Sequence, residues 1–198
     1  MANNNCLTAL IEKSLKSHWD REAFTDYKGA TLLYRDVAER IAKLHILFEE
    51  AGIERGDRIA LCGKNSSNWA VACLAGISYG AVVVPILHEF KADNVHNIVN
   101  HSEAKLFFVG EQVWENLNES SMPAVEGIIV MEGYQVVISR NEKIIHAREH
   151  MNELFGKKYP KDFSKDDVNY VETFDEELAM INYTSGSTGN PKGVMLTA

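Results

Sequence analysis

The stretch Arg58-Ile-Ala-Leu-Cys-Gly-Lys-Asn-Ser-Ser67, continued to Ala81-Val-Val-Val-Pro85, decides the fold. Its first five residues are largely apolar, as in a strand covered on both faces of a parallel sheet. Ser66 or Ser67 can cap the helix that follows, and the β-branched run from Ala81 predicts a second strand, ended by Pro85. The stretch therefore predicts a βαβ unit.

A second unit of the same kind follows this one. Its elements are a helix with Val95, Ile98 and Val99 on one face, a strand at Lys105–Val109, a helix at Gln112–Leu117 and a strand at Gly127–Met131. Strands that alternate with helices in this way pack as a parallel sheet between two helical layers. The predicted fold class is α/β, a doubly wound, mostly parallel sheet with helices on both faces.

The residues before these units predict two helices and a hairpin. Leu7–Ser17 reads as a helix, and Ala23–Leu33 as two short strands that turn at Lys28-Gly29. From Arg35 to Glu50 apolar residues recur every three or four positions, which places them on one helical face. Gly52 then stands where a left-handed C-terminal cap is expected.

The residues after the two units are less regular. Val136–Ile138 and Ile144-Ile145 flank a polar segment, which predicts a hairpin, and a helix is expected through His150 and Phe155. Residues 157–177 are rich in Lys, Asp and Glu and predict an excursion over the surface. The apolar run Leu178–Tyr183 predicts a strand that leads directly into a glycine-rich loop.

Charge and composition exclude several classes of protein. The 198 residues carry a net charge of −8, whereas nucleic-acid-binding modules concentrate Lys and Arg, so no nucleic-acid partner is expected. The longest apolar run, Ala70–Leu87, contains Ser78, Gly80 and Pro85 and is a poor bilayer span. The first residues lack the features of a secretory signal, so a cytoplasmic protein is predicted. The oligomeric state stays open.

The cysteines and histidines do not favour a metal site. Cys6, Cys62 and Cys73 are odd in number and lack CxxC spacing, which predicts reduced, buried thiols. His88, His96 and His101 cluster in sequence, but solvated or capping histidines are far commoner than ligands at such positions. We therefore expect no protein-held metal in these residues.

The loop Thr184-Ser-Gly-Ser-Thr-Gly-Asn-Pro-Lys-Gly193 carries the chemistry. Glycines permit close approach, hydroxyl and backbone N–H groups donate to anionic oxygens, and Lys192 adds positive charge. The sequence is neither a Walker A motif nor a GxGxxG dinucleotide fingerprint. A polyphosphate cradle is the functional interpretation, and a flexible Gly/Ser/Thr surface turn is the structural alternative.

Nine positions from Thr184 to Lys192 match the signature of the adenylate-forming superfamily, which includes acyl-CoA synthetases, luciferases and peptide-synthetase adenylation domains. Leu33–Ala42, Arg55–Leu61, Asn65–Trp69 and Tyr79–Pro85 also resemble the opening segments of these enzymes, in order and spacing. The resemblance implies that residues 1–198 are the N-terminal portion of an AMP-binding domain, ending after the loop at 184–193. It implies phosphate contacts from Thr184, Ser185, Ser187, Thr188 and Lys192, with Gly186, Gly189 and Gly193 shaping the loop.

The resemblance further implies a two-step reaction with ATP, Mg²⁺ and coenzyme A. A carboxylic acid, by similarity a long-chain fatty acid, would form an acyl-AMP and then a thioester. Alternatives are an adenylation domain that loads an amino or aryl acid onto a carrier protein, and a non-catalytic α/β binding module. No catalytic residue is expected in residues 1–198, which alone should be inactive. Contact with a membrane surface remains open.

Overall fold

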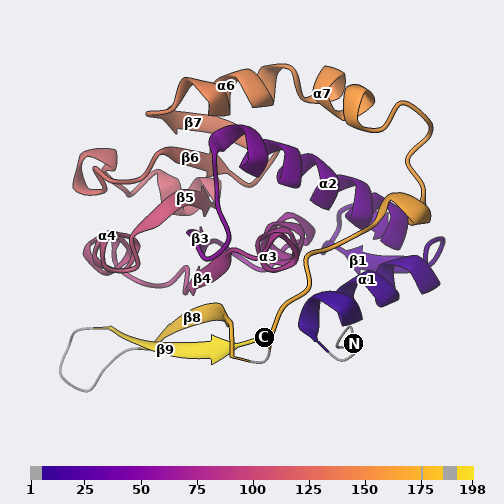
Figure 1. Cartoon of the computed structure of the whole chain (residues 1–198). Helices are drawn as coiled ribbons and strands as arrows, with labels where there is room; N and C mark the ends of the chain where they lie inside the picture. Colours follow the sequence, from indigo (N-terminus) through magenta and orange to yellow (C-terminus); the bar gives the residue numbers. More distant parts are fainter. Residues whose placement is uncertain (1–5, 175, 185–190) are drawn as a thin grey trace.

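The computed structural model describes residues 6–174, 176–184 and 191–198. Figure 1 shows a sheet seen nearly along its strands, with helices on its two sides. The helices are α1 (Leu7–Ser17), α2 (Tyr34–Ala51), α3 (Ser67–Tyr79), α4 (Ala92–His101), α5 (Glu111–Trp114), α6 (Glu142–Glu149) and α7 (Met151–Lys158), with short 3₁₀ turns at Glu119–Ser121 and Lys165–Asp167. The strands are β1 (Glu22–Thr25), β2 (Thr31–Leu33), β3 (Arg58–Cys62), β4 (Val82–Ile86), β5 (Ala104–Val109), β6 (Gly127–Val130), β7 (Gln135–Ser139), β8 (Leu178–Thr184) and β9 (Lys192–Thr197).

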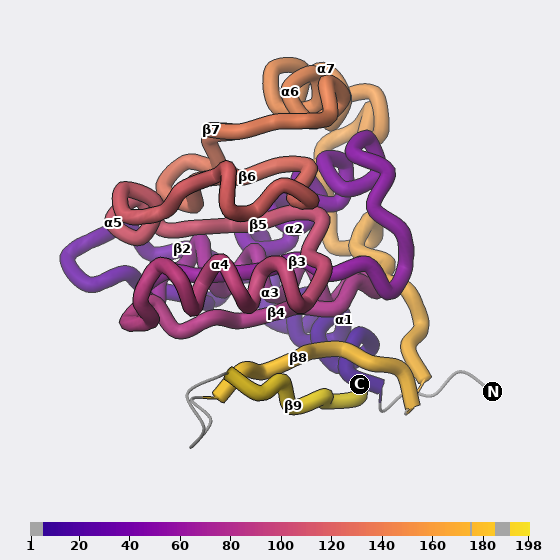
Figure 2. The backbone as a smooth tube through the Cα atoms, turned by 90° about the vertical axis from the view of Figure 1, so that its left-hand side faces the viewer, coloured from indigo at the N-terminus to yellow at the C-terminus, as the bar shows by residue number. Residues whose placement is uncertain are grey.

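Among these residues the main sheet has seven strands in the order β7-β6-β5-β3-β4-β8-β9. The five inner strands run parallel, whereas β7 and β9 pair antiparallel at the two edges. The chain passes from β3 to β4 through α3 and then returns across β3 to β5 through α4. Figure 2 views the sheet from the α4 side, with α3 behind it. The predicted doubly wound, mostly parallel fold is confirmed.

Side chains of successive strand residues pack on opposite faces of the sheet, which explains why helices cover both. One face packs against α2 and α3 and includes Ile59, Leu61, Val83, Leu106 and Phe108. The other packs against α4 and includes Ala60, Cys62, Val84, Phe107 and Val109. Burial of a large apolar side chain stabilises a fold by roughly 1.5–3 kcal/mol, so exposure of either face would be costly. The two helical layers are thus required by the strand sequences.

The ends of α2 and α3 and the burial of the cysteines agree with the predictions made from the sequence. Gly52 ends α2 in the left-handed conformation at φ 74°, and the Ser66 side chain accepts a hydrogen bond from Trp69 N at the start of α3. The cysteines are buried free thiols, and burial raises the pKa of Cys62 to about 12. No helix in the described part of the chain is both long and apolar enough to cross a bilayer.

The hairpin predicted for residues 136–145 is wrong. β7 pairs with β6 instead, after a tight turn in which Gly133 and Tyr134 have positive φ. Asn141 caps α6 by accepting a hydrogen bond from Lys143 N, which starts a helix where the second strand was expected. Ile144 is fully buried in the core shared with α2 and α3. Ile144 is apolar because its helix packs on this core. Two apolar residues in a row fit a strand as well as a helix, so the sequence alone could not distinguish the two.

Three further features differ from the prediction: two element boundaries and one strand that was not predicted. Pro85 lies within β4 rather than ending it, and the pairing of β4 with β8 is at Val83 and Met180, away from the proline. α5 is shorter than the predicted 112–117, and β9 was not predicted. Residues 157–174 and 176–177 do cross the surface, although Val168 and Thr173 are buried.

His45 on α2 is enclosed between α2 and α3. Its Nε2 lies 3.0 Å from the Ala75 carbonyl oxygen, and the rings of Tyr79 and Tyr170 meet it edge-on at centroid distances of 5.3 and 5.6 Å. Burial lowers the pKa of His45 to about 4, opposed by the hydrogen bond to Ala75 and reinforced by repulsion from Lys158. The folded protein therefore needs this imidazole neutral, with Nε2–H donating to Ala75.

We expect stability to fall as the pH drops below about 6.5, because the unfolded chain then binds a proton that folded His45 binds only near pH 4. The loss attributable to His45 should be about 2–3 kcal/mol between pH 7 and pH 4.5. His45→Gln keeps a donor but does not titrate, so it should show a smaller loss. Urea denaturation of both proteins at the two pH values measures this difference, and equal losses would contradict the assignment.

Candidate functional site

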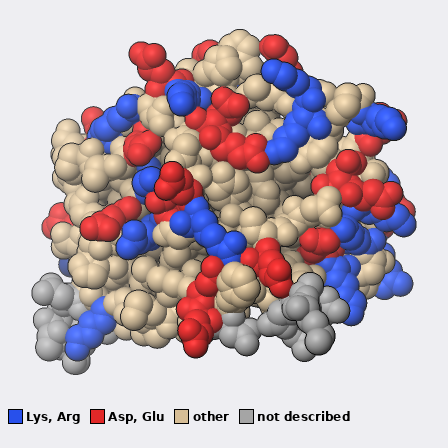
Figure 3. Space-filling view, in the orientation of Figure 1, with Lys and Arg blue, Asp and Glu red and all other residues tan. Residues whose placement is uncertain are grey.

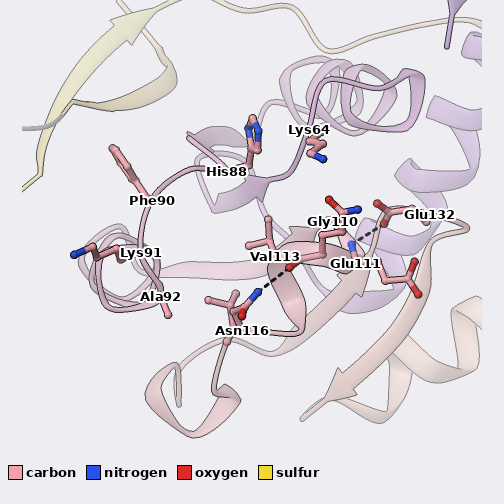
Figure 4. Close-up of a pocket in the computed structure, with 12 residues that line it drawn as sticks. Lys64, His88, Phe90, Lys91, Ala92, Gly110, Glu111, Val113, Asn116 and Glu132 are labelled. Atoms are coloured by element: carbon pink, nitrogen blue, oxygen red, sulfur yellow. Dashed lines mark hydrogen bonds between the residues drawn. The ribbon is translucent and has the colours of Figure 1, made fainter. Parts of the chain in front are cut away.

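A large crevice lies where four parallel strands end. β3, β4, β5 and β6 stop at Cys62, Ile86, Val109 and Val130, and each is followed within two residues by a lining residue of the crevice. The crevice measures about 840 Å³ and is lined by Lys64, His88, Phe90, Lys91, Ala92, Gly110, Glu111, Gln112, Val113, Asn116, Leu117 and Glu132 (Figure 4). Ligands of open α/β sheets bind at this edge, where the order of strands reverses.

Two glycines lie close together where the order of strands reverses. β3 and β5 are adjacent, and the Gly110 N–H donates to the Cys62 carbonyl at 2.8 Å. A Cβ atom on Gly63 would lie 3.2 Å from Gly110 N and 3.4 Å from Gly110 Cα. The two backbones therefore approach more closely than a side chain on Gly63 would permit, and Gly110 is one of the residues that line the crevice.

The crevice carries charges of both signs. Figure 4 shows Phe90 and Lys91 on the α4 side and Glu111 and Glu132 on the opposite side. Glu132 Oε2 accepts a hydrogen bond from Glu111 N at 3.0 Å, which ties the turn after β6 to the start of α5. Figure 3 likewise shows acidic and basic side chains interspersed on the face seen in Figure 1. An anion at this face would therefore meet local groups rather than a broad positive field.

The glycine-rich loop starts at the same edge of the sheet, because β8 runs parallel to β4. β8 ends at Thr184 and β9 begins at Lys192, and these two residues are paired across the hairpin. Both are exposed. Of the predicted phosphate contacts, the structure places Thr184 and Lys192 side by side, whereas Ser185, Gly186, Ser187, Thr188 and Gly189 lie outside the described residues.

The three clustered histidines do not converge. His96 Nε2 accepts a hydrogen bond from Asn118 N at 3.1 Å, His101 Nδ1 lies 2.6 Å from the Tyr183 hydroxyl, and His88 lies beside Glu89. Within residues 6–174, 176–184 and 191–198 no three His, Cys, Asp or Glu side chains are placed to hold a metal.

Sequence reasoning missed the crevice and the strand that closes the loop. Lys64, Gly110 and Glu132 each follow a predicted strand directly, so their common position at the carboxyl edge was available from the predicted topology. β9 gave a weaker sequence signal for a strand, because its residues are all exposed and show no alternation of buried and exposed positions.

Comparison with known proteins completes the description of the site. The family model described as AMP-binding enzyme matches residues 11–198. The chain belongs to the AMP-binding enzyme family. The glycine-rich loop between β8 and β9 is thus part of a family match that extends over nearly the whole chain.

Relatives in this family include several ligases. The chain is 32% identical over 171 residues to YdaB of Bacillus subtilis (strain 168), by name an acyl–CoA ligase, covering 84% of this chain and 30% of that protein. It is 28% identical to long chain acyl-CoA synthetase 4 of Arabidopsis thaliana, covering 83% and 24%. It is 27% identical to surfactin synthase subunit 1 of Bacillus subtilis (strain 168), covering 94% and 4%. The chain spans less than a third of each relative.

Solved structures support the same fold. The anthranilate CoA ligase AuaEII in complex with anthranoyl-AMP matches with a TM-score of 0.75 at 20% identity, over 96% of this chain and 34% of that one. A long-chain-fatty-acid-CoA ligase of Archaeoglobus fulgidus, FadD1, matches with a TM-score of 0.70 at 24% identity, over 100% and 37%. The sheet described above therefore has the same fold as part of these two ligases.

The contact between Gly63 and Gly110 can be tested by substitution. Gly63→Ala should destabilise the protein by about 1–3 kcal/mol, because the Met131 side chain can move away but the Gly110 backbone cannot. Gly156→Ala in α7 is the control, since a Cβ atom there would have no neighbour within 4 Å. That change should stabilise by about 0.5–1 kcal/mol through helix propensity. Urea denaturation decides, and a Gly63→Ala protein as stable as the parent would refute the close approach.

Proposed function

We propose that residues 1–198 are the amino-terminal part of an ATP-dependent acid–thiol ligase. The observation that carries the proposal is the Thr184–Gly193 sequence at the carboxyl edge of a sheet that belongs to the AMP-binding enzyme family. The full-length protein would convert a carboxylic acid and ATP into an acyl-AMP and pyrophosphate, and then pass the acyl group to coenzyme A. A cytoplasmic location stays a prediction from the amino-terminal sequence.

The proposed role of the loop is electrostatic. A carboxylate oxygen attacks the α phosphorus of ATP, the bond from that phosphorus to the bridging oxygen breaks, and its electron pair leaves with pyrophosphate. Negative charge grows on the leaving group, so donors aimed at the β and γ phosphates stabilise the transition state. Thr184, Ser185, Ser187 and Thr188 would supply hydroxyl or backbone donors, Gly186 and Gly189 close approach, and Lys192 a positive charge.

Magnesium would supply further positive charge to the phosphates. The described residues bring no three candidate ligands together, so they do not fit a protein-held magnesium site, and no step is assigned to one.

In the second step the thiol of coenzyme A attacks the acyl carbon and AMP leaves. We propose that residues 1–198 alone complete neither step, because they span less than a third of the relatives they match.

A long-chain fatty acid is the proposed acid. Ile181–Leu196 resembles the corresponding stretch of bacterial long-chain ligases, and relatives of this chain include proteins named as long-chain acyl-CoA synthetases. The second candidate is an amino acid loaded onto a carrier protein, favoured by the match to surfactin synthase over 94% of this chain. A non-catalytic binding module is the third and least supported possibility.

Lys192→Ala in the full-length protein should slow ATP–pyrophosphate exchange by about 10²–10³-fold, since it removes a charge that faces the developing pyrophosphate. Stability should change little, because Lys192 is exposed. Lys157→Ala, at an exposed lysine of α7, is the matched control and should leave exchange unchanged. Unchanged exchange in Lys192→Ala would refute the proposed role of this lysine.

The identity of the acid is tested separately, with ATP, coenzyme A and acids from acetate to palmitate. Each buried CH₂ favours binding by about 0.8 kcal/mol, so kcat/KM should rise up to about fourfold per added carbon until the pocket is filled. AMP release by the purified full-length protein measures this. If acetate or an amino acid is used better than every acid of ten or more carbons, the fatty acid is the wrong substrate, although the adenylate-forming proposal survives.

A further inference from the structure

Tyr183, the residue directly before Thr184, is joined to α4. Its hydroxyl lies 2.6 Å from Nδ1 of His101, the last residue of α4. The two rings are nearly perpendicular, at 89°, with centroids 5.8 Å apart. Figure 2 shows α4 in front of the sheet to which β8 belongs, with β4 between α4 and β8 in this view. The hydrogen bond thus links the end of β8 to a helix that belongs to the preceding βαβ unit.

The same tyrosine also contacts the other strand of the hairpin. Tyr183 is paired with Gly193, the residue directly after Lys192. A Cβ atom on Gly193 would lie 3.2 Å from Tyr183 Cζ and 3.4 Å from Cε1, so the ring packs against the Gly193 backbone. One side chain therefore touches the strand that ends at Thr184 and the strand that begins at Lys192.

The environment keeps the Tyr183 hydroxyl protonated. Tyr183 is only 4% exposed, within the core beneath α4, and burial raises its pKa, so the hydroxyl keeps its proton. The hydroxyl can donate to Nδ1 of His101 in the tautomer that carries the imidazole proton on Nε2. Among the described residues His101 is the hydrogen-bond partner of this hydroxyl, so the contact constrains the position of the ring.

We propose that His101 and Tyr183 form a latch that positions Thr184 and Lys192 for ATP. Both are positioning residues, since they would act on ATP through Thr184 and Lys192, which adjoin Tyr183 and Gly193 in the chain. The inference rests on the proposed function and extends it, because it assigns to α4 a part in phosphate binding that the Thr184–Gly193 sequence alone does not contain. Without the latch, β8 and β9 stay paired but their ends at Thr184 and Lys192 are free to shift relative to the sheet.

The test uses the full-length protein with Tyr183→Phe, His101→Ala and the double variant. Tyr183→Phe keeps the ring against Gly193 and removes only the hydroxyl. Each single change should raise the KM for ATP in pyrophosphate exchange about five- to twentyfold, and the double variant should be no worse than the more affected single variant, because both remove one interaction. His101→Gln offers an oxygen acceptor and should restore the KM to within about threefold of the parent.

Tyr79→Phe is the matched control. It also removes a tyrosine hydroxyl that donates to a partner, the Ile53 carbonyl at 3.0 Å, but this hydrogen bond involves neither α4 nor the strand ends at Thr184 and Lys192. If loss of such a hydrogen bond acted only through stability, Tyr79→Phe and Tyr183→Phe would lower the thermal midpoint alike and leave the KM for ATP unchanged. That result overturns the latch.

Amide hydrogen exchange separates this inference from the proposed function. Exchange at Thr184 and at Lys192–Val194 should become at least tenfold faster in Tyr183→Phe and His101→Ala than in the parent and in Tyr79→Phe. If the parent shows no pyrophosphate exchange with any acid, the proposed function fails, whereas faster amide exchange still supports the latch. Unchanged amide exchange at both strand ends overturns the latch whatever the activity.

Discussion

Burial of both faces of β3 and β5 is the constraint on which the rest of this structure depends. Ile59 and Leu61 pack toward α3 while Ala60 and Cys62 pack toward α4, so neither face can be left to water. Parallel strands are joined by right-handed crossovers, and covering both faces therefore requires the chain to reverse its direction across the sheet. The reversal falls between β3 and β5, and the crevice at their carboxyl ends follows from it.

The hairpin of β8 and β9 is built on a different principle. β8 adds to β4 as a further parallel strand, but β9 lies at the edge of the sheet with every residue exposed. Its position depends on pairing with β8 and on the contact of Gly193 with Tyr183, rather than on burial of its own side chains. The edge that carries the Thr184–Gly193 sequence is therefore held by strand pairing and by the contact of Tyr183 with Gly193, whereas the adjacent crevice is held by the core.

The contrast explains how much could be predicted from the sequence. The bounds of α1 and β3 and the left-handed cap at Gly52 agree with the prediction, because apolar periodicity and glycine chemistry are local signals. The segment around Ile144 was misassigned, since two apolar residues fit a strand as well as a helix packed on α2. The loop sequence indicated Thr184 and Lys192, but their pairing across the hairpin and the approach of His101 to Tyr183 depend on contacts between residues far apart in the chain.

The proposed recognition of phosphate by a chain with a net charge of −8 would have to work at short range. Charges in physiological salt are screened beyond about 8 Å, so neither the acidic surface nor distant lysines decide the affinity for a polyphosphate. Donors within hydrogen-bonding distance decide it, and their value depends on being held in place before the ligand arrives. A side chain that fixes the ends of β8 and β9 can therefore influence ATP binding as much as an added positive charge. On this argument the scaffold that holds Thr184 and Lys192 is part of the proposed binding site.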